Sequence, residues 1–312
     1  MVFNILIAVG LDFLIGDPHG FPHPVKLMGN IINLEDRLVR RIFKGGKGLK
    51  LAGLIIVLTN IFLGFFIPYL ILRFLRAYKV LYNTLEVYLI YTCIAAKSLD
   101  VETTKVYKAF DLGLDEARVK LSYIVGRETH SLNEMEIVKG AVETVSENTS
   151  DGVIAPLFYI FLFGLPGGLA YKFINTMDSM LGYMNDKYID LGYFPARLDD
   201  IANYLPARLT GFLMIVSSFG RFDISPGLKI MIRDRKNHKS PNSAYPESAV
   251  AGLLGVELGG GNYYHGIYVH KPTIGDNLNS LNKSHIQNAI EIMYRSEMLF
   301  LALATTVSLV LS

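Results

Sequence analysis

The chain has 312 residues, of which 51% are hydrophobic and 19% are charged, with 30 basic and 28 acidic side chains. Soluble globular chains are usually about 25% charged, so this composition excludes a disordered or nucleic-acid-coating protein and disfavours a purely cytosolic enzyme. The balanced charge indicates nothing about polyanionic partners, and the single cysteine, Cys93, excludes an intrachain disulfide. The sequence therefore predicts an integral membrane protein with substantial polar segments.

The first apolar segment, residues 1–16, contains Asp12 and lacks the basic start and the small-residue cleavage site of a signal peptide. We expect a membrane-inserted helix that leads into a proline-rich loop. The prolines impose an extended path on this loop and keep His19 and His23 from sharing a helix face. Three interpretations stay open for it: a rigid interfacial connection, a segment that contacts substrate, or a metal site.

The strongest membrane signal is residues 51–72, which carry no charge. About 20 apolar residues suffice for a helix to cross the hydrocarbon core, so this segment predicts a transmembrane helix. Residues 80–96 form a weaker second span that contains Glu86, either facing the bundle interior or acting as a site carboxylate in the membrane. The apolar residues 298–312 are a candidate last span if residues 290–294 extend them.

Residues 152–171 are also uncharged, but GLPGG at residues 164–168 interrupts them. Glycine with proline breaks a helix more often than it bends one, so this segment is either a broken span or a re-entrant hairpin. Residues 209–220 are too short to cross alone, and Ser225 is expected to cap a following helix. With no linker visible, we predict one mostly α-helical, polytopic membrane domain over residues 1–312. It would have four to six membrane-inserted segments, some re-entrant, and cytoplasmic polar loops.

Residues 126–152 are a polar stretch that runs directly into this interrupted segment. A capping box at residues 131–134 predicts that a helix begins near Leu132. Glu136, Gly140, Glu143 and Glu147 follow at spacings of four or three residues, which places the three carboxylates along one helix face. Such a stripe is either exposed to solvent or gathers a cation or a basic partner. Its position beside a membrane segment favours a functional role.

Two further segments combine carboxylates with basic side chains. In residues 172–186, Asn175 and Asp178 share a helix face. In residues 196–208, Asp199 and Asn203 lie one turn apart and are flanked by two arginines. Carboxylates and arginines near a membrane suit a phosphorylated substrate, because Mg²⁺ bridges phosphate oxygens while arginine binds them bidentately. Buried salt bridges between helices are the alternative.

Residues 233–276 contain a glycine run at 259–261, which is neither a P-loop nor a dinucleotide fingerprint. His238 and Lys239 precede a helix expected to begin near Pro246, where they form either an anion site or a solvated basic loop. From the residues alone, the chain is a membrane enzyme that handles a phosphorylated, anionic substrate with a divalent cation.

Five motifs occur in a fixed order along the chain: GDPHGFPHPV, GRETHSLNEMEIVKGAVETVSENTSDGVIAPLFY, KFINTMDSMLGY, RLDDIANYLPARLT and HKSPNSAYPESAVAGLLGVELGG. Together they resemble the CobD/CbiB family of cobalamin biosynthesis, the adenosylcobinamide-phosphate synthases, over about residues 11–276. The resemblance implies an integral membrane ligase that uses ATP and Mg²⁺. It would join (R)-1-amino-2-propanol O-phosphate, or a related amino alcohol, to the f-propionate of adenosylcobyric acid. Membrane lipid and other late cobalamin biosynthesis enzymes are the expected partners, and nucleic acid is not.

Charge and motif position lead to roles within that reaction, in which a carboxylate or histidine takes the proton of the attacking amine and Mg²⁺ neutralises charge on the transferred group. The candidate catalytic residues are Glu143, Glu147, Asp178, Asp199 and His23. The candidate substrate- and phosphate-binding residues are Arg127, Lys172, Asn175, Arg197, Arg208, His238 and Lys239. The candidate metal ligands are Asp151, Asp178, Asp199 and Asp200. No motif locates the ATP site.

If all five motifs line one site, residues 151 and 172 must lie on the same side of the membrane, because a full crossing would separate them by roughly 30 Å. Residues 164–168 are then the tip of a re-entrant hairpin, and a second one turns at residues 221–226. The basic residues 37–50 favour the cytoplasmic face of the cell membrane for the active site, while Arg73, Arg76 and Lys79 weakly favour the opposite orientation.

Two other functions compete with the ligase. A loose cluster of aspartates and asparagines in residues 175–190 is superficially similar to a Mg²⁺-dependent membrane transferase acting on a diphosphate substrate, which needs tighter Asp pairs. A transporter would need two matching halves, which the sequence lacks.

Overall fold

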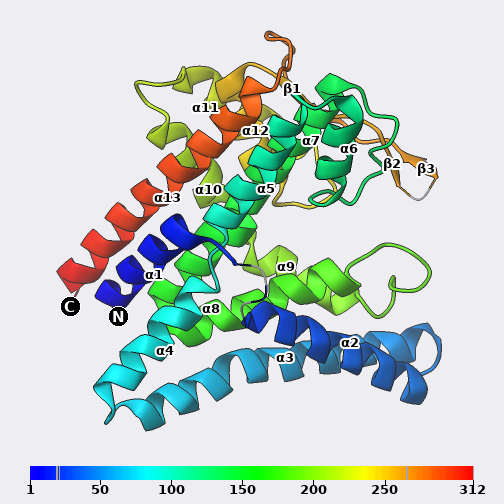
Figure 1. Cartoon of the computed structure of the whole chain (residues 1–312). Coiled ribbons are helices and arrows are strands. Elements are labelled where there is room, and N and C mark those ends of the chain that lie inside the picture. Colours follow the sequence, from blue (N-terminus) through cyan, green and yellow to red (C-terminus); the bar gives the residue numbers. More distant parts are fainter. Residues whose placement is uncertain (19, 21, 265, 312) are drawn as a thin grey trace. The chain divides into compact units, whose positions relative to one another are not determined.

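The computed structural model describes residues 1–311 except 19, 21 and 265, so the expectation for His19 lies outside the described residues. The chain is mostly helical (Figure 1). The helices are α1 (Val2–Ile15), α2 (Pro24–Ile42), α3 (Gly45–Leu75), α4 (Lys79–Tyr91), α5 (Ala96–Ala109), α6 (Leu114–Ser122), α7 (Glu134–Thr149), the π-helical turn η1 (Ser150–Ile154), α8 (Ala155–Leu181), α9 (Tyr193–Ala202), α10 (Tyr204–Ser217), α11 (Ile224–Asp234), α12 (Ala244–Leu254) and α13 (Ser284–Leu311). The strands are β1 (Glu257–Gly259), β2 (Asn262–Tyr264), β3 (Ile267–Val269) and β4 (Thr273–Gly275).

The chain divides into two compact units that interleave in sequence. Unit 1 comprises Met1–Ala95 and Ala155–Asn203, and unit 2 comprises Ala96–Ile154 and Tyr204–Ser312. Each unit therefore combines two separate stretches of chain, and each is described by itself below.

Unit 1 is built around α3 and α8. The two helices approach closely at Gly64, where an added Cβ would lie 2.8 Å from the Cα of Ala170. Only glycine allows so short a distance between the backbones. α2 also packs against α8, and α1 packs against α4.

The α8 segment reverses direction at Gly164, whose φ of 70° lies in the left-handed region. The rings of Tyr159 and Tyr171 stack with centroids 5.2 Å apart. In an uninterrupted helix these residues, twelve positions apart, would be about 18 Å apart. A Cβ added to Gly168 would lie 2.4 Å from Cγ1 of Ile160, so the two arms of the segment pack directly against each other. The helix break predicted at residues 164–168 is confirmed, with Gly164 at the turn.

The proline-rich loop before α2 is held by side chains of α4. The hydroxyls of Tyr88 and Tyr91 donate to the carbonyl oxygens of Pro22 and Gly16. His23 is the N-cap of α2, where its Nδ1 accepts the Val25 N–H at 3.3 Å. This capping ring also faces Asp17, with Nε2 3.4 Å from the carboxylate.

Three helical segments are long and apolar enough to cross a membrane: Gly45–Leu75, Glu134–Leu181 and Ser284–Leu311. The predicted span at residues 51–72 lies within the first of them, and residues 298–311 of the last predicted span lie within the third. α1 and α10 are apolar but shorter. The weaker predicted span at residues 80–96 corresponds to α4, whose 13 residues fall short of the about 20 that a crossing helix needs. The structure therefore supports a helical membrane protein with three candidate spans.

Unit 2 packs α12 against α10 and α11, and α13 against α7, α5 and α10. α12 is buried over its whole length from Ala244 to Leu254. Two antiparallel strand pairs follow it: β1 with β4, in which Glu257 faces Gly275, and β2 with β3. These short strands place their loops beside α7, so unit 2 brings distant polar segments together.

Two helix starts differ from the sequence expectation. The capping box of α7 joins Asn133 and Glu136, not Ser131 and Glu134, because the Asn133 side chain accepts the Glu136 N–H at 3.0 Å while Glu136 accepts the Asn133 N–H. α11 is capped by Asp223, whose carboxylate accepts the Ser225 N–H. In both cases a neighbouring residue with equal capping preference occupies the N-cap.

Candidate active site

A small, charged pocket lies in unit 2 between α7, the start of α12 and the β-strand loops. Its volume of 160 Å³ is below the roughly 300–1,000 Å³ that encloses a drug-sized ligand, so the pocket fits a small molecule. Its lining residues are Ile124, Val125, Gly126, Arg127, Glu143, Thr144, Glu147, Asn148, His238, Glu247, Gly259, Asn262, Tyr264 and Lys271. Four candidate site residues, Arg127, Glu143, Glu147 and His238, thus come together from two separate motifs.

Glu143 is the most firmly held carboxylate of the pocket. One of its oxygens pairs with the Arg127 guanidinium, and the other accepts the Gly259 N–H at 2.7 Å. Arg127 also donates to the side-chain oxygen of Asn262 at 3.2 Å. The Arg127 and Glu143 side chains are both about nine-tenths buried. The basic partner that the acidic stripe requires is therefore Arg127, and the glycine run at 259–261 supplies a donor to a carboxylate.

Glu147 and Glu247 face the pocket from adjacent helices. Glu147 lies one turn after Glu143 and accepts the Ser243 hydroxyl hydrogen at 2.7 Å. Glu247 lies one turn into α12 and is only 4% exposed. Burial, with the nearby Glu147 and Glu143 charges adding to it, raises the pKa of the Glu247 carboxyl well above its ordinary value. Burial in this pocket therefore favours the protonated, neutral form of the Glu247 carboxyl, against the opposing effect of Lys271 and Arg127.

His238 enters the pocket from the loop after α11. Its Nδ1 accepts the Ser240 N–H at 3.1 Å, which leaves the ring proton on Nε2. Burial lowers the pKa of His238 below its ordinary value, so the ring is neutral at pH 7. His238 can therefore donate a hydrogen bond into the pocket. The second cation of the lining, beside Arg127, is Lys271.

A second polar cluster lies in unit 1, on α8 and α9. Asp199 is 8% exposed and accepts hydrogen bonds from the Asn203 amide at 3.0 Å and the Asn175 amide at 3.5 Å. The Tyr171 hydroxyl donates to Asn203 at 2.8 Å and so fixes that amide. Burial and then the nearby Asp178 carboxylate raise the pKa of Asp199 to about 7. Asp178, Asp199 and Asn175, predicted from separate motifs, thus belong to one cluster.

The remaining candidates lie outside the lining of the polar pocket. Arg208 is stacked between two tyrosines, with its guanidinium carbon 3.5 Å from the Tyr204 ring centroid and 4.3 Å from that of Tyr245. Lys239 is exposed, and Asp151 lies in η1. The candidates in unit 1 are Lys172 on α8, Arg197 and Asp200 on α9, and the capping residue His23.

Among the described residues, no group of three or more His, Cys, Asp or Glu side chains is placed to hold a metal ion. Mg²⁺ usually binds through only one or two carboxylates, with water and substrate phosphate completing its shell. The Asp178 carboxylate adds to the raised pKa of Asp199, so the cluster holds two carboxyl groups. This pair therefore fits a Mg²⁺ ion that is shared with a phosphorylated substrate.

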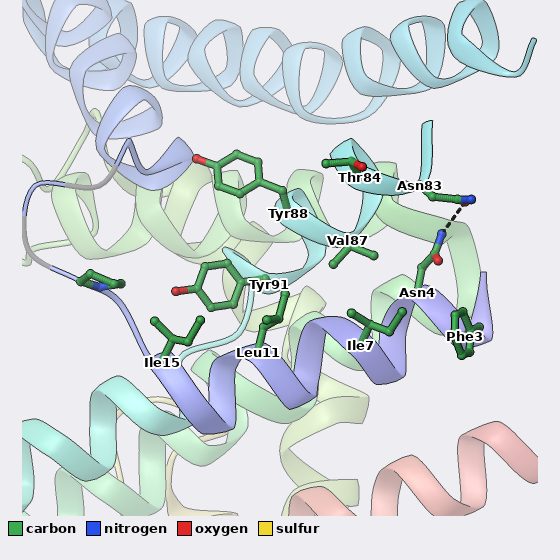
Figure 2. Close-up of a pocket in the computed structure, with 11 residues that line it drawn as sticks. Phe3, Asn4, Ile7, Leu11, Ile15, Asn83, Thr84, Val87, Tyr88 and Tyr91 are labelled. Carbon is green, nitrogen blue, oxygen red and sulfur yellow. Dashed lines mark hydrogen bonds between the residues drawn. The ribbon is translucent and has the colours of Figure 1, made fainter. Parts of the chain in front are cut away.

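A larger cavity of 540 Å³ lies between α1 and α4 in unit 1 (Figure 2). Phe3, Ile7, Leu11 and Val87 make up much of its wall, and the Asn4 amide donates to Asn83 at 2.9 Å at one end. The described lining contains no carboxylate and no cation. This cavity suits an apolar group, whereas the charged pocket suits acid–base chemistry.

Glu247, Lys271, Asn262 and Tyr264 line the pocket but were not among the site residues predicted from the sequence. Glu247 lay in a quoted motif, and a signal was available: it is the one charged residue in AYPESAVAGLL, which is otherwise almost entirely apolar. A buried helix keeps such a carboxyl only at a cost, which indicates a function. Asn262, Tyr264 and Lys271 carry no comparable signal because they come from short strands and loops.

The three long apolar helical segments and the buried charged pocket define the chain as a membrane protein with an enzyme-like site. The sequence model of the CobD/Cbib protein family matches residues 5–293. The chain is 51% identical over 300 residues to the cobalamin biosynthesis protein CobD of Clostridium tetani, covering 96% of this chain and 95% of that one. It is 43% identical over 300 residues to the cobalamin biosynthesis protein CbiB of Salmonella paratyphi B, covering 95% and 94%.

The chain therefore belongs to the CobD/CbiB family of cobalamin biosynthesis enzymes. No solved structure matches it.

Proposed function

We propose that the protein is an amide-forming ligase that joins an amino alcohol, or its phosphate, to the f-propionate of adenosylcobyric acid with ATP and Mg²⁺, as the family resemblance implies. The observation that carries this proposal is the small charged pocket of unit 2, found here in a chain of the CobD/CbiB family. It is lined by Arg127, Glu143, Glu147, His238 and Glu247. Amide formation needs a site that binds a cationic amine and removes its proton, and a carboxylate-lined pocket supplies both.

In this proposal the pocket of unit 2 binds the amino alcohol. Its 160 Å³ fits a molecule of that size but neither a corrin ring nor a whole nucleotide. The carboxylates bind the ammonium group, and the Nε2–H of His238 and the Lys271 ammonium bind the oxygen end of the substrate. The Arg127–Glu143 pair fixes the wall of the pocket, since both Glu143 oxygens are used within the protein.

We assign Mg²⁺ to Asp178 and Asp199 of unit 1. When bound there with ATP, the ion would neutralise charge on the phosphoryl group that activates the propionate. Asn203 and Asn175 hold the Asp199 carboxylate in place, and a nearby cation would favour its ionised form, which burial and Asp178 disfavour.

For the membrane arrangement, we propose that the reversal at Gly164 is the tip of a re-entrant hairpin. Polar residues before and after it then lie on the same side of the membrane, and the basic residues 37–50 place that side in the cytoplasm. Non-helical backbone at membrane depth must be buried in protein, and the packing of Ile160 against Gly168 provides this. Other late cobalamin enzymes would then meet this cytoplasmic face.

The proposal is tested by reconstitution of purified protein in detergent with adenosylcobyric acid, ATP, Mg²⁺ and aminopropanol phosphate. Mass spectrometry should detect a corrinoid heavier by the amino alcohol phosphate minus water, and its formation should require ATP. Asp199→Asn should lower the rate and raise the Mg²⁺ concentration needed for half activity, whereas Asp115→Asn, a fully exposed control in unit 2, should not. An unchanged corrinoid mass in the complete mixture would refute the ligase function.

A further inference from the structure

The Glu247 carboxyl stands apart from the other acids of the pocket in unit 2. Glu143 accepts hydrogen bonds on both oxygens, and Glu147 accepts one from Ser243. No hydrogen bond from any residue that the structure describes reaches Glu247, although it is 4% exposed and lines the pocket. Buried polar groups almost always have a hydrogen-bond partner, so the partner of this pocket-lining carboxyl is expected to be a ligand.

The charges that face Glu247 show which ligand is missing. Glu143 and Glu147 approach from α7, Arg127 from the segment before α7, and Lys271 from the segment before β4. His238 is neutral. If Glu247 ionises, three carboxylates face two cations, and one positive charge is needed to balance the pocket. A primary ammonium group supplies that charge and up to three hydrogen-bond donors in a volume that this pocket can hold.

We propose that Glu247 is the proton acceptor for the primary ammonium group of the amine substrate. This inference rests on the proposed ligase function and adds a residue role to it. In the step, the ammonium N–H proton passes to a Glu247 oxygen, and the freed nitrogen lone pair forms the bond to the carbonyl carbon of the propionate, which ATP has activated as an anhydride with phosphate. The carbon–oxygen bond to that phosphate breaks and its electron pair leaves with the phosphate oxygen. The second N–H proton passes to the departing phosphate as the amide forms.

The other titratable groups of the pocket are less suited to accept this proton. The Nδ1 lone pair of His238 is engaged by the Ser240 N–H, and its Nε2 already carries hydrogen. Glu143 is ion-paired with Arg127. One Glu147 oxygen accepts the Ser243 hydroxyl hydrogen. In this proposal its other oxygen orients the ammonium group. Glu247 alone combines a free carboxyl group with burial, which makes it a stronger base than an exposed glutamate.

Proton release on binding tests this role without catalysis. The free ammonium carries its proton at pH 7, and burial favours the protonated form of Glu247 in the free protein, so forming the ion pair expels the Glu247 proton, up to one per bound amine. We would measure the binding of 1-amino-2-propanol by titration calorimetry in two buffers with different ionisation enthalpies. This probe has only one ionisable group, and 1,2-propanediol is its uncharged counterpart. The wild type should release about one proton and bind the diol at least tenfold more weakly.

Glu247→Gln is the matched variant, because glutamine copies the neutral acid that the free protein holds and should fold normally. It should bind the amine without proton release, lower kcat for amide formation by about 10²- to 10⁴-fold and change KM less. The pH range over which its rate increases should also lie higher than in the wild type, because the ammonium must then lose its proton to water. Glu247→Asp should recover part of the rate. Glu116→Gln is the control, since this exposed residue pairs with Lys120 on α6.

The outcomes separate this inference from the ligase function. If the wild type forms amide and Glu247→Gln keeps its kcat and pH profile, Glu247 is not the proton acceptor and the ligase stands. If the wild type binds the amine with proton release but forms no amide, the ammonium site is supported and the ligase function fails. Binding of the amine without proton release, or equal binding of the diol, overturns the inference.

Discussion

The reversal of α8 at Gly164 can be tested by enlarging a residue on one arm of the segment and shrinking the residue that it contacts on the other arm. A Cβ at position 168 would lie 2.4 Å from Cγ1 and 2.9 Å from Cδ1 of Ile160, whereas carbon atoms in contact are normally about 3.5–4.0 Å apart. Gly168→Ala should therefore destabilise unit 1 by about 1–3 kcal/mol through overpacking, less up to about 1 kcal/mol of improved helix propensity.

Ile160→Ala removes both clashing carbons and leaves a cavity, at a cost of about 2–5 kcal/mol. In the double variant the new methyl group at position 168 fills part of that cavity and meets no clash. We therefore expect the double variant to be more stable than the sum of the single changes by about 0.5–3 kcal/mol. At about 2–4 °C per kcal/mol, this coupling corresponds to roughly 1–12 °C in the unfolding temperature.

The chain carries its own reporter for this measurement. Cys93 is its only cysteine, is 1% exposed and lies in unit 1, so a thiol-reactive fluorophore added during heating in detergent reports exposure of this unit. The matched control is Gly10→Ala on α1, where nothing lies within 4 Å of an added Cβ and no destabilisation is expected. If the Ile160 and Gly168 changes are additive, or if Gly168→Ala behaves like Gly10→Ala, the arms do not pack together and the reversal is refuted.

Three further predictions concern single sites. Arg127→Ala leaves the buried Glu143 carboxylate without its cation and should destabilise unit 2 by about 3–5 kcal/mol, whereas replacing both residues by apolar ones should restore most of that stability. Resistance to a protease measures the stability of each variant, and an equal loss in the single and the double variant would contradict the prediction. The folded-state pKa of Asp199, about 7, lies above its ordinary value, so without Mg²⁺ the folded state loses stability as pH rises from about 4 to 7, by at most about 1.4 kcal/mol per unit. In thermal unfolding with a chelator present, the stability of Asp199→Asn relative to the wild type should therefore increase as the pH rises over this range. A difference in unfolding temperature that stays constant with pH would count against the burial of this acid beside Asp178. Gly164→Ala forces a side chain to φ 70° and should cost about 1–2 kcal/mol in the thiol-exposure assay, with no change if the turn lies elsewhere.

Sequence periodicity was sufficient for the features that depend on neighbours along one helix. The uncharged residues 51–72 lie within α3, and the four-residue spacing of Glu143 and Glu147 does place both on one wall of a pocket. The break at GLPGG also follows from local chemistry, because glycine at φ 70° ends a helix wherever it occurs. These features needed no knowledge of the tertiary structure.

The features that the sequence did not yield depend on packing between distant segments. Glu247 becomes an unusual acid only because α10, α11 and α7 enclose α12 and because Glu147 faces it from α7. The extent of α4 was also overestimated, since an apolar run continues to Ala96 while the helix ends at Tyr91. Capping residues two positions apart have similar preferences, so the helix starts at α7 and α11 were misplaced by local patterns alone.

The interleaving of the two units dictates an order of assembly during synthesis. Residues 96–154 emerge from the ribosome before their partners in α10–α13, while the chain between them completes the other unit. At about 5–20 residues per second, the remaining 158 or so residues take roughly 8–30 s to make. During that time the face of α7 that ends against α12 and α13 is uncovered. This face of α7 therefore finds its native partners only when the last helices have been made, and neither unit can be cut out as a single continuous fragment.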